Sequence, residues 1–351
     1  MRIWCMLFLL LLCLPGGAQE KKPDWRLSGD ARWRYENDTN RPSGPGRERG
    51  RIRYRIQLIG DLSKQLELGL RARTGDPHLP ISANYSFLNS LKETETFGFN
   101  VDMAYLRYHP GDFNLVVGKS QAMFGANSPY GKLLWDTDYV PPGAWMGFQT
   151  REWSVRGGRY FLDAAPNYLP LGVNIADGSY RFKPSQNTEL AFDVSFYGFD
   201  DTAGLRLPQN RGNAVSRGRL RSNFQLIDPS LTYSFAIGEV PVSTSLYYIK
   251  NLAASIPQDS AWAAGFAAGR LREPGDWSGF YRFQRVEQDA LFSPVAQDDF
   301  TLAVNFEGHT AGVSHQLTQD LSAQAWVLAA EPLVPPGGTQ FRYRLDLFLK
   351  Y

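Results

Sequence analysis

The stretch that decides the fold is Phe341 to Tyr351, which reads FRYRLDLFLKY. Every second residue is apolar or aromatic: Phe341, Tyr343, Leu345, Leu347, Leu349 and Tyr351. The intervening positions are polar at four of five places, with Arg342, Arg344, Asp346 and Lys350. Because successive side chains of a strand point to opposite faces, this pattern predicts a strand with one apolar and one charged face. Its length and its aromatic ends suit a strand that crosses a bilayer in about 9–11 residues.

The same alternation recurs along the chain. It is clearest in Trp25 to Glu36, Arg51 to Ile59 and Leu66 to Arg73. Short turns alternate with long, polar, Gly- and Pro-rich connections, which is typical of a closed antiparallel transmembrane β-barrel. We predict an all-β fold of about 16 strands with both termini on the short-turn side. In two segments, 172–183 and 298–317, the pattern fits either one strand or two.

Bulk composition is compatible with a barrel. Charged residues make up 21% of the chain and the mean hydropathy is −0.34. No run of about 18 apolar residues predicts a spanning helix, but a barrel alternates lipid-facing and lumen-facing residues and stays polar on average. The aromatic content of 14% favours interfacial aromatic belts. It also fits the core of a periplasmic sandwich or propeller, which is the soluble alternative.

The first 18 residues are typical of a signal peptide, so the mature domain is expected to span 19–351. Arg2 provides the positive end, Ile3 to Leu14 the apolar segment and Gly16-Gly17-Ala18 the cleavage site. Both cysteines of the chain, Cys5 and Cys13, lie in this segment, so we expect no disulfide in the mature protein. Basic and acidic residues nearly balance, at 37 and 35, which gives no indication of nucleic-acid binding.

Several motifs together resemble a known family. They are RGRIRYRIQLIGDLSKQLELGLRARTGD (49–76), DMAYLRYHPGDFNLVVGK (102–119), Leu134-Trp135-Asp136 and the tail from Asp276 to Tyr351. The chain resembles the putative-porin family of Gram-negative outer-membrane proteins. The resemblance implies a barrel with short periplasmic turns and long extracellular loops, located in the outer membrane and acting as a diffusion channel. It supplies no catalytic residues.

The resemblance also implies partners. The barrel is expected to contact outer-membrane lipid and to pass small solutes, and the closing strand 341–351 is expected to bind the barrel-assembly machinery. Assembly as a homotrimer follows by analogy with other sixteen-stranded porins.

Cations cluster on the polar faces of four segments that closure would make neighbours. They are Arg26, Arg32, Arg34, Arg51, Arg53, Arg55, Arg71, Arg73, Arg342, Arg344 and Lys350. An arginine facing lipid at the midplane costs about 2–4 kcal/mol, and eleven such costs would exceed a typical folding stability of about 5–15 kcal/mol. We therefore predict that this basic wall lines an aqueous lumen and favours anions. Asp30, Glu36, Glu67 and Asp346 share its face, and simple pairing of arginines with carboxylates is the alternative interpretation.

The loop Ser120 to Pro142 is the candidate constriction, by resemblance to channels whose third long loop folds inward. It carries Asp136 and Asp138. Carboxylates opposite a basic wall would set up a transverse field across the pore. An ordinary external loop is the alternative.

Catalytic and metal-binding patterns are weak. Ser314 and His315 are neighbours on a predicted strand and so point to opposite faces, which excludes them as a catalytic pair. No cluster of histidines and carboxylates suggests a metal, and we expect neither a cofactor nor enzymatic activity. A structural or adhesive barrel with a blocked lumen stays open as an alternative function, as does, with less support, a barrel hydrolase.

Overall fold

The structure is a computed structural model. It describes residues 23–41, 44–76, 82–87, 98–121, 133–162, 171–207, 210–297, 299–300 and 302–351. The predicted signal peptide lies outside the described residues. Within those ranges, no helix has both the length and the apolar character needed to cross a bilayer.

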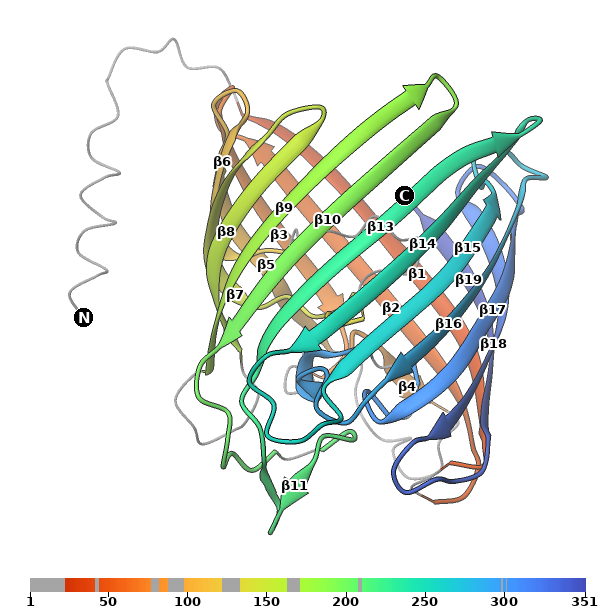
Figure 1. Cartoon of the computed structure of the whole chain (residues 1–351). Helices are drawn as coiled ribbons and strands as arrows, with labels where there is room; N and C mark the ends of the chain where they lie inside the picture. Colours follow the sequence, from red (N-terminus) through yellow and green to blue (C-terminus); the bar gives the residue numbers. More distant parts are fainter. Residues whose placement is uncertain are drawn as a thin grey trace.

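Sixteen strands form one closed antiparallel barrel (Figure 1), as the sequence predicted. They are β1 (Asp24–Thr39), β2 (Arg47–Asp61), β3 (Leu66–Thr74), β5 (Phe99–Tyr108), β6 (Phe113–Lys119), β7 (Pro142–Gln149), β8 (Trp153–Leu162), β9 (Leu171–Ser185), β10 (Thr188–Phe199), β13 (Gln225–Ile237), β14 (Val240–Asn251), β15 (Ser260–Gly269), β16 (Trp277–Val286), β17 (Phe306–Gln316), β18 (Leu321–Pro332) and β19 (Gln340–Lys350). Each pairs with the next in this order, and β19 pairs with β1.

The C-terminal strand closes the barrel. Its register with β1 runs from Asp30 opposite Lys350 to Thr39 opposite Phe341. Beyond the strand, the Tyr351 N–H donates to the Gly29 carbonyl at 3.1 Å, and the Gly29 N–H donates to the Tyr351 carbonyl at 2.9 Å. The Tyr351 ring crosses Gly29, where a Cβ would overlap it, and its hydroxyl donates to the Arg55 carbonyl at 3.2 Å. Backbone pairing is thus continuous around the cylinder, as lipid requires.

The expected alternation of short turns and long loops is confirmed. Short turns join β2 to β3, β5 to β6, β7 to β8, β9 to β10, β13 to β14, β15 to β16 and β17 to β18, and they lie at the upper end in Figure 1. The two open segments are settled as well: 172–183 lies within β9 alone, and the part of 298–317 that the structure describes holds β17 alone.

Besides a single turn of 3-10 helix, η2 (Ser293–Val295), two small features of the described residues were not predicted. The strand β4 (Tyr85–Phe87) lies within the loop after β3 and pairs with Gly50 to Ile52 of β2. It occupies a part of β2 that extends beyond its pairing with β3, and so covers backbone groups that would otherwise form an open edge. The hairpin of β11 (Val215–Ser216) and β12 (Arg219–Leu220) lies in the loop between β10 and β13.

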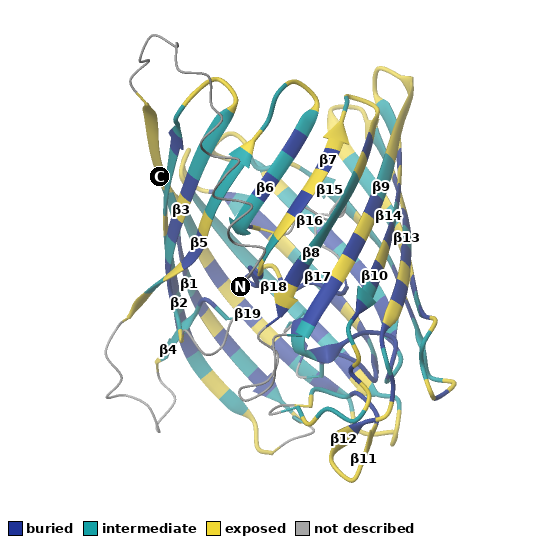
Figure 2. Ribbon diagram, turned by 90° about the vertical axis from the view of Figure 1, so that its left-hand side faces the viewer, coloured by how far each residue is buried: buried dark blue, intermediate teal, exposed yellow. Residues whose placement is uncertain are grey.

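The outer surface carries two aromatic belts around an apolar band. Figure 2 shows buried and exposed residues alternating along the strands. Exposed aromatics near the short-turn ends are Trp25, Tyr108, Phe148, Trp153, Tyr180 and Trp277; those near the long-loop ends are Tyr35, Phe99, Phe161, Phe196, Tyr248 and Tyr343. Tyr and Trp favour the two interfaces of a membrane, so these belts are where a transmembrane barrel would have them.

The hydrophobic core lies inside the barrel, towards its long-loop end. Loop residues such as Leu134, Phe224 and Phe292 pack there against inward-facing aromatic residues of the strands. The Phe292 ring centroid lies 5.2 Å from that of Phe199, at the end of β10, and 5.4 Å from that of Phe224. The long loops therefore fold back into the bore and narrow it.

Candidate functional site: the bore and its basic wall

The basic wall is formed by β19, β1, β2 and β3, which are consecutive in the closed sheet. At its centre is Glu36 of β1, a carboxylate with no exposed surface. It accepts hydrogen bonds from Arg344 Nε at 2.6 Å, Arg49 Nε at 2.7 Å and Arg51 Nη1 at 3.4 Å. These partners come from both neighbouring strands, so closure of the barrel creates the cluster.

A second pair lies one step further along the wall. Arg34 and Asp346 face each other in the β1–β19 register. Their side chains form two hydrogen bonds, of 2.6 and 2.9 Å. The Trp326 indole N–H also donates to Asp346 at 2.9 Å, and the Arg344 guanidinium lies 4.5 Å from the centroid of the Trp326 ring. Such charge-assisted, two-pronged contacts fix the orientation of the arginine side chain.

Of the other predicted cations, Arg342 pairs with the buried Asp38 of β1 and Arg32 donates to Asn84. The rest fall into two groups. Arg53 and Arg55 share Asp30, at 2.8 and 2.7 Å, and Arg71 binds Asp102 of β5 at 2.7 Å, with Arg73 Nε 3.6 Å from the same carboxylate. In contrast, Arg26 and Lys350 are exposed, near the short-turn ends of their strands. Arg26 pairs there with Asp61 and belongs to the rim rather than to the buried set.

Sequence reasoning missed several members of the wall. Arg47 and Arg49 extend the row on β2, while Asp38 and Asp102 provide buried carboxylates. Asp38 and Arg49 keep the alternation of the neighbouring strand residues, so slightly longer predicted strands would have included them. Most of the wall is therefore a network of ion pairs rather than a row of separate positive charges.

The described part of the candidate constriction loop, 133–142, lies inside the barrel; residues 122–132 are outside the described residues. Leu133 and Leu134 belong to the internal core. The Asp138 carboxylate accepts a hydrogen bond from Arg53 at 3.1 Å, and Asp136 accepts the backbone N–H of Asp138 at 2.8 Å. The geometry differs from the transverse arrangement that we predicted, because Asp138 lies on the basic wall and not across the pore from it.

A second loop reaches the same wall. Asp299, in the loop between β16 and β17, accepts a hydrogen bond from Arg344 Nη1 at 2.6 Å. Burial alone would raise the pKa of the Asp299 carboxyl, but the neighbouring arginines outweigh burial and lower it. The pKa of Asp138 is lowered for the same reason, with Arg53 as its largest favourable neighbour. Both loop carboxylates are thus ionised at neutral pH and hold their loops against the wall.

The opposite side of the bore is acidic. Seven strands separate β1 from β10 in either direction around the sheet, so these strands face each other. β9, β10 and β13 place Asp177, Asp193 and Asp228 on the inner face, all of them buried. Arg156 of β8 binds Asp177 through Nε at 2.9 Å. The alternation of polar and apolar residues in these three strands could have placed the carboxylates on the inner face. Because the three carboxylates are far apart in sequence, they did not stand out as one group.

A cavity of about 320 Å³ lies between the basic wall and residues of three inward-folded loops. Strand residues at its lining include Arg32, Phe280, Arg282, Trp326 and Phe348. The loops contribute Asn84, Asp136, Thr137, Asp138, Gln297, Asp299 and Phe300. This cavity is where the internal surface of the barrel combines cations, amides and aromatic rings.

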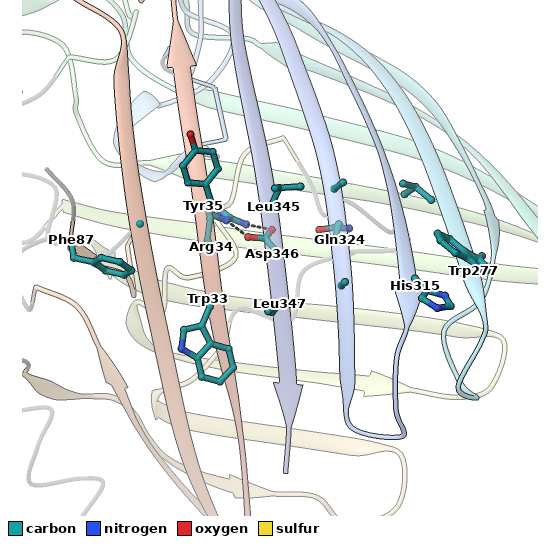
Figure 3. A pocket seen from close by; sticks show the side chains of 14 residues that line it. Trp33, Arg34, Tyr35, Phe87, Trp277, His315, Gln324, Leu345, Asp346 and Leu347 are labelled. Carbon is teal, nitrogen blue, oxygen red and sulfur yellow. Dashed lines mark hydrogen bonds and ion pairs between the residues drawn. The ribbon is translucent and has the colours of Figure 1, made fainter.

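A larger hollow, of about 770 Å³, lies on the outer surface (Figure 3). Its floor is formed by Ala323 and Ala325 of β18, between Leu345 and Leu347 on one side and Trp277 and His315 on the other. These residues are outward-facing, and the Arg34–Asp346 pair drawn in Figure 3 belongs to the inner face behind them. The hollow therefore opens towards the membrane and is not part of the bore.

Ser314 and His315 lie on opposite sides of β17, as the sequence predicted. Ser314 is buried on the inner face, whereas His315 faces outward and stacks on Trp277, with ring centroids 4.1 Å apart. The two side chains therefore cannot act together as nucleophile and base. Among the residues that the structure describes, no group of three or more His, Cys, Asp or Glu could hold a metal ion.

Comparison with known proteins connects this geometry to a family. The model of the family described as "Putative porin" matches residues 38–162, the region that carries β2, β3 and the constriction loop. The resemblance to the putative porins is confirmed. No curated protein matches the chain in sequence.

Solved porin structures have the same fold. The anion-selective porin from Comamonas acidovorans aligns with a TM-score of 0.57 at 10% identity, covering 94% of this chain and 100% of that one. OmpT, an outer-membrane protein of Vibrio cholerae in its trimer form, gives the same values. A triple mutant of Rhodopseudomonas blastica porin aligns with a TM-score of 0.56 at 8% identity, covering 93% and 100%. At such low identity these three proteins share the architecture with this chain, and the similarity does not extend to individual site residues.

Proposed function

We propose that the protein is an outer-membrane channel through which small hydrophilic solutes diffuse passively, with a preference for anions. The observation that supports it is the basic wall, which places arginines of four adjacent strands on the inner face of a closed barrel. A transmembrane barrel of this size holds a polar, water-accessible interior. The proposal also includes the location of this chain in the outer membrane after signal-peptide cleavage.

Anion preference is supported by an excess of arginines over carboxylates at the wall, although ion pairs neutralise much of the charge. The field from a fixed set of side chains acts strongly in a narrow pore with low-dielectric walls. The inward-folded loops meet the wall where Asp138 and Asp299 bind Arg53 and Arg344. Passing anions would meet these guanidinium groups beside the cavity.

A second candidate function is a barrel whose lumen is blocked. The apolar packing of loop residues such as Phe292 and Val295 inside the long-loop end favours it. A protein of this kind would be structural or adhesive and would carry no ionic current.

Single-channel recording in planar bilayers distinguishes the two. In asymmetric KCl, we expect a measurable conductance and a reversal potential on the anion-selective side. Replacement of Arg53, Arg55 and Arg344 by glutamine exposes the charge of Asp30, Asp138 and Glu36, so the reversal potential should shift towards cation selectivity. An unchanged reversal potential would show that the wall does not determine selectivity. If the folded protein carries no current, the blocked barrel is favoured.

A matched control removes the same charge away from the bore. Lys64, Arg151 and Arg272 are exposed cations in three short turns, and their combined replacement by glutamine should leave the reversal potential nearly unchanged. An equal shift in both triple variants would indicate a general effect of net charge.

Homotrimeric assembly is part of the proposal. OmpT of Vibrio cholerae, which shares the barrel architecture, occurs in a trimer form. In this chain, the apolar hollow on β17, β18, β19 and β1 provides a membrane-facing surface that a second copy of the chain or lipid would cover.

A further inference from the structure

The cavity beside the basic wall contains one cation that differs from its neighbours. Arg32 is 8% exposed, and within the described part of the chain it forms no ion pair shorter than 4 Å. Its Nη2 donates to the neutral amide oxygen of Asn84, and its Nε has no hydrogen-bond partner among the described residues. A buried guanidinium without a carboxylate partner is costly, so its position in the wall of a cavity indicates a ligand that supplies the missing negative charge.

The carboxylates that line the cavity are engaged elsewhere. Asp138 binds Arg53 at 3.1 Å, and Asp299 binds Arg344 at 2.6 Å. Asp136 accepts the backbone N–H of Asp138 at 2.8 Å. Arg34, the neighbour of Arg32 on this face, is held by Asp346. Arg34 is thus paired with a carboxylate, whereas Arg32 keeps its Nε without a hydrogen-bond partner among the described residues and is a group available to an anion.

Beside the cation, the lining is aromatic, and Phe348 of β19 is the register partner of Arg32 of β1. Phe280 of β16 and Phe348 of β19 both face the cavity, and the Phe280 ring meets Trp326 edge-on, with centroids 6.4 Å apart. Arg282 also lies in the lining, 5.5 Å from the centroid of the Tyr247 ring. A pocket with buried cations and an aromatic wall fits a ligand with an anionic end and a flat apolar body.

We propose that this cavity binds a small monocarboxylate that carries a single aromatic ring, with the carboxylate on the Arg32 guanidinium and the ring between Phe280 and Phe348. The volume of about 320 Å³ lies at the small end of ligand pockets, which span about 300–1,000 Å³, and so admits one ring. The proposal deepens the proposed channel function, on which it rests, by naming the solute class that is recognised at the constriction.

Isothermal titration calorimetry on the full mature chain in detergent tests the site directly. Sodium phenylacetate is the probe, and three other ligands serve for comparison. Acetate lacks the ring, benzyl alcohol lacks the charge, and phenylethylammonium carries the opposite charge. We expect phenylacetate to bind measurably and each of the other three at least about tenfold more weakly, because each loses either the charge-assisted hydrogen bonds or the apolar contact. Equal binding of acetate and phenylacetate would overturn the role of the aromatic wall.

Variants locate the site. Arg32→Gln should weaken phenylacetate binding about tenfold. Phe348→Leu should weaken the binding of phenylacetate but leave the affinity for acetate unchanged. Unchanged acetate binding shows that the variant is folded, so the loss can be assigned to recognition of the ring. Arg272→Gln removes an exposed turn cation and should bind like the unsubstituted chain. Unchanged affinity in the Arg32 variant would overturn the proposal.

Conductance recorded on the same samples separates this inference from the channel function. Phenylacetate should interrupt the current of the unsubstituted channel at concentrations near its calorimetric dissociation constant, and interrupt it less in Arg32→Gln. A conducting channel that neither binds phenylacetate nor is interrupted by it would overturn the solute class and leave the channel assignment standing. Phenylacetate binding without any conductance would overturn the channel and leave a binding cavity.

Discussion

At the scale of single residues, the basic wall depends on buried carboxylates as much as on arginines. Glu36 has no exposed surface and accepts hydrogen bonds from Arg344, Arg49 and Arg51. Each of these guanidinium groups would remain buried and lose part of its compensation if the carboxylate were removed. Removal of one partner of a buried ion pair is far more costly than the net value of the pair.

We therefore expect Glu36→Gln to lower the free energy of unfolding by about 3–5 kcal/mol. Urea titration of the protein folded in lipid vesicles, followed by tryptophan fluorescence, measures this change. Asp61→Asn is the matched control, because it breaks the exposed pair with Arg26, and exposed pairs contribute little. Similar losses in the two variants would show that the Glu36 cluster is solvated and does not hold the wall together.

At the scale of elements, closure of the barrel depends on a close approach between β1 and the C-terminal residue. The Tyr351 ring crosses Gly29 at a place where a Cβ would overlap ring atoms and the Arg55 carbonyl of β2. Gly178 of β9 is a glycine in the same kind of strand, but a Cβ added there would lie 4.0 Å from its nearest neighbour, the Ser154 carbonyl. Both glycines therefore lie in strands, but only Gly29 is packed so closely that a side chain would not fit.

Gly29→Val is expected to displace Tyr351 and to destabilise the closing pair of strands by about 1–3 kcal/mol, the usual range for overpacking. Gly178→Val should be much less harmful, since β-branched residues suit strands. The temperature at which the folded band is lost on a non-boiled gel compares the two. A Gly178 variant that unfolds as early as the Gly29 variant would contradict the closing role of Tyr351.

At the scale of the whole molecule, two long loops and the end of β14 join inside the barrel at Asp289. This buried carboxylate accepts hydrogen bonds from Ser222 Oγ at 2.6 Å, the Ala214 N–H at 2.9 Å and Asn213 Nδ2 at 3.4 Å. Asn251 Nδ2 donates to the Asp289 carbonyl at 2.8 Å. Burial raises the pKa of the Asp289 carboxyl despite the hydrogen bonds that favour its charged form.

A raised pKa means that the docked loops bind the proton more tightly than undocked loops do. Docking is therefore most favourable below the usual carboxyl pKa and weakens as the pH rises through the raised value. We expect proteolysis of the 200–224 loop, normalised to the rate for the unfolded chain, to be slower near the usual carboxyl pKa, at about pH 4, than at pH 7. Asp289→Asn should reduce this dependence on pH; an unchanged dependence in that variant would assign it to another group.

Residue periodicity, together with the alternation of short turns and long loops, was sufficient to predict the barrel, about 16 strands and the charge of its basic wall. Segments such as 341–351 and 51–59 alternate strictly, and the cost of charged side chains in lipid decides which face is inward. β4 was not predicted because three residues are too few to show the alternation of a strand. It forms where the edge of β2 has backbone groups without a partner strand.

The composition of the constriction was decided only by the tertiary structure. Asp138 and Asp299 neutralise Arg53 and Arg344 from loops that are distant in sequence, and Arg32 is left without a carboxylate partner among the described residues. Alternation fixes the face on which a strand residue lies, but the folding of loops into the bore determines which charges meet. Local sequence thus determined the cylinder and its polarity, while long-range electrostatics and packing inside it determined the candidate binding cavity.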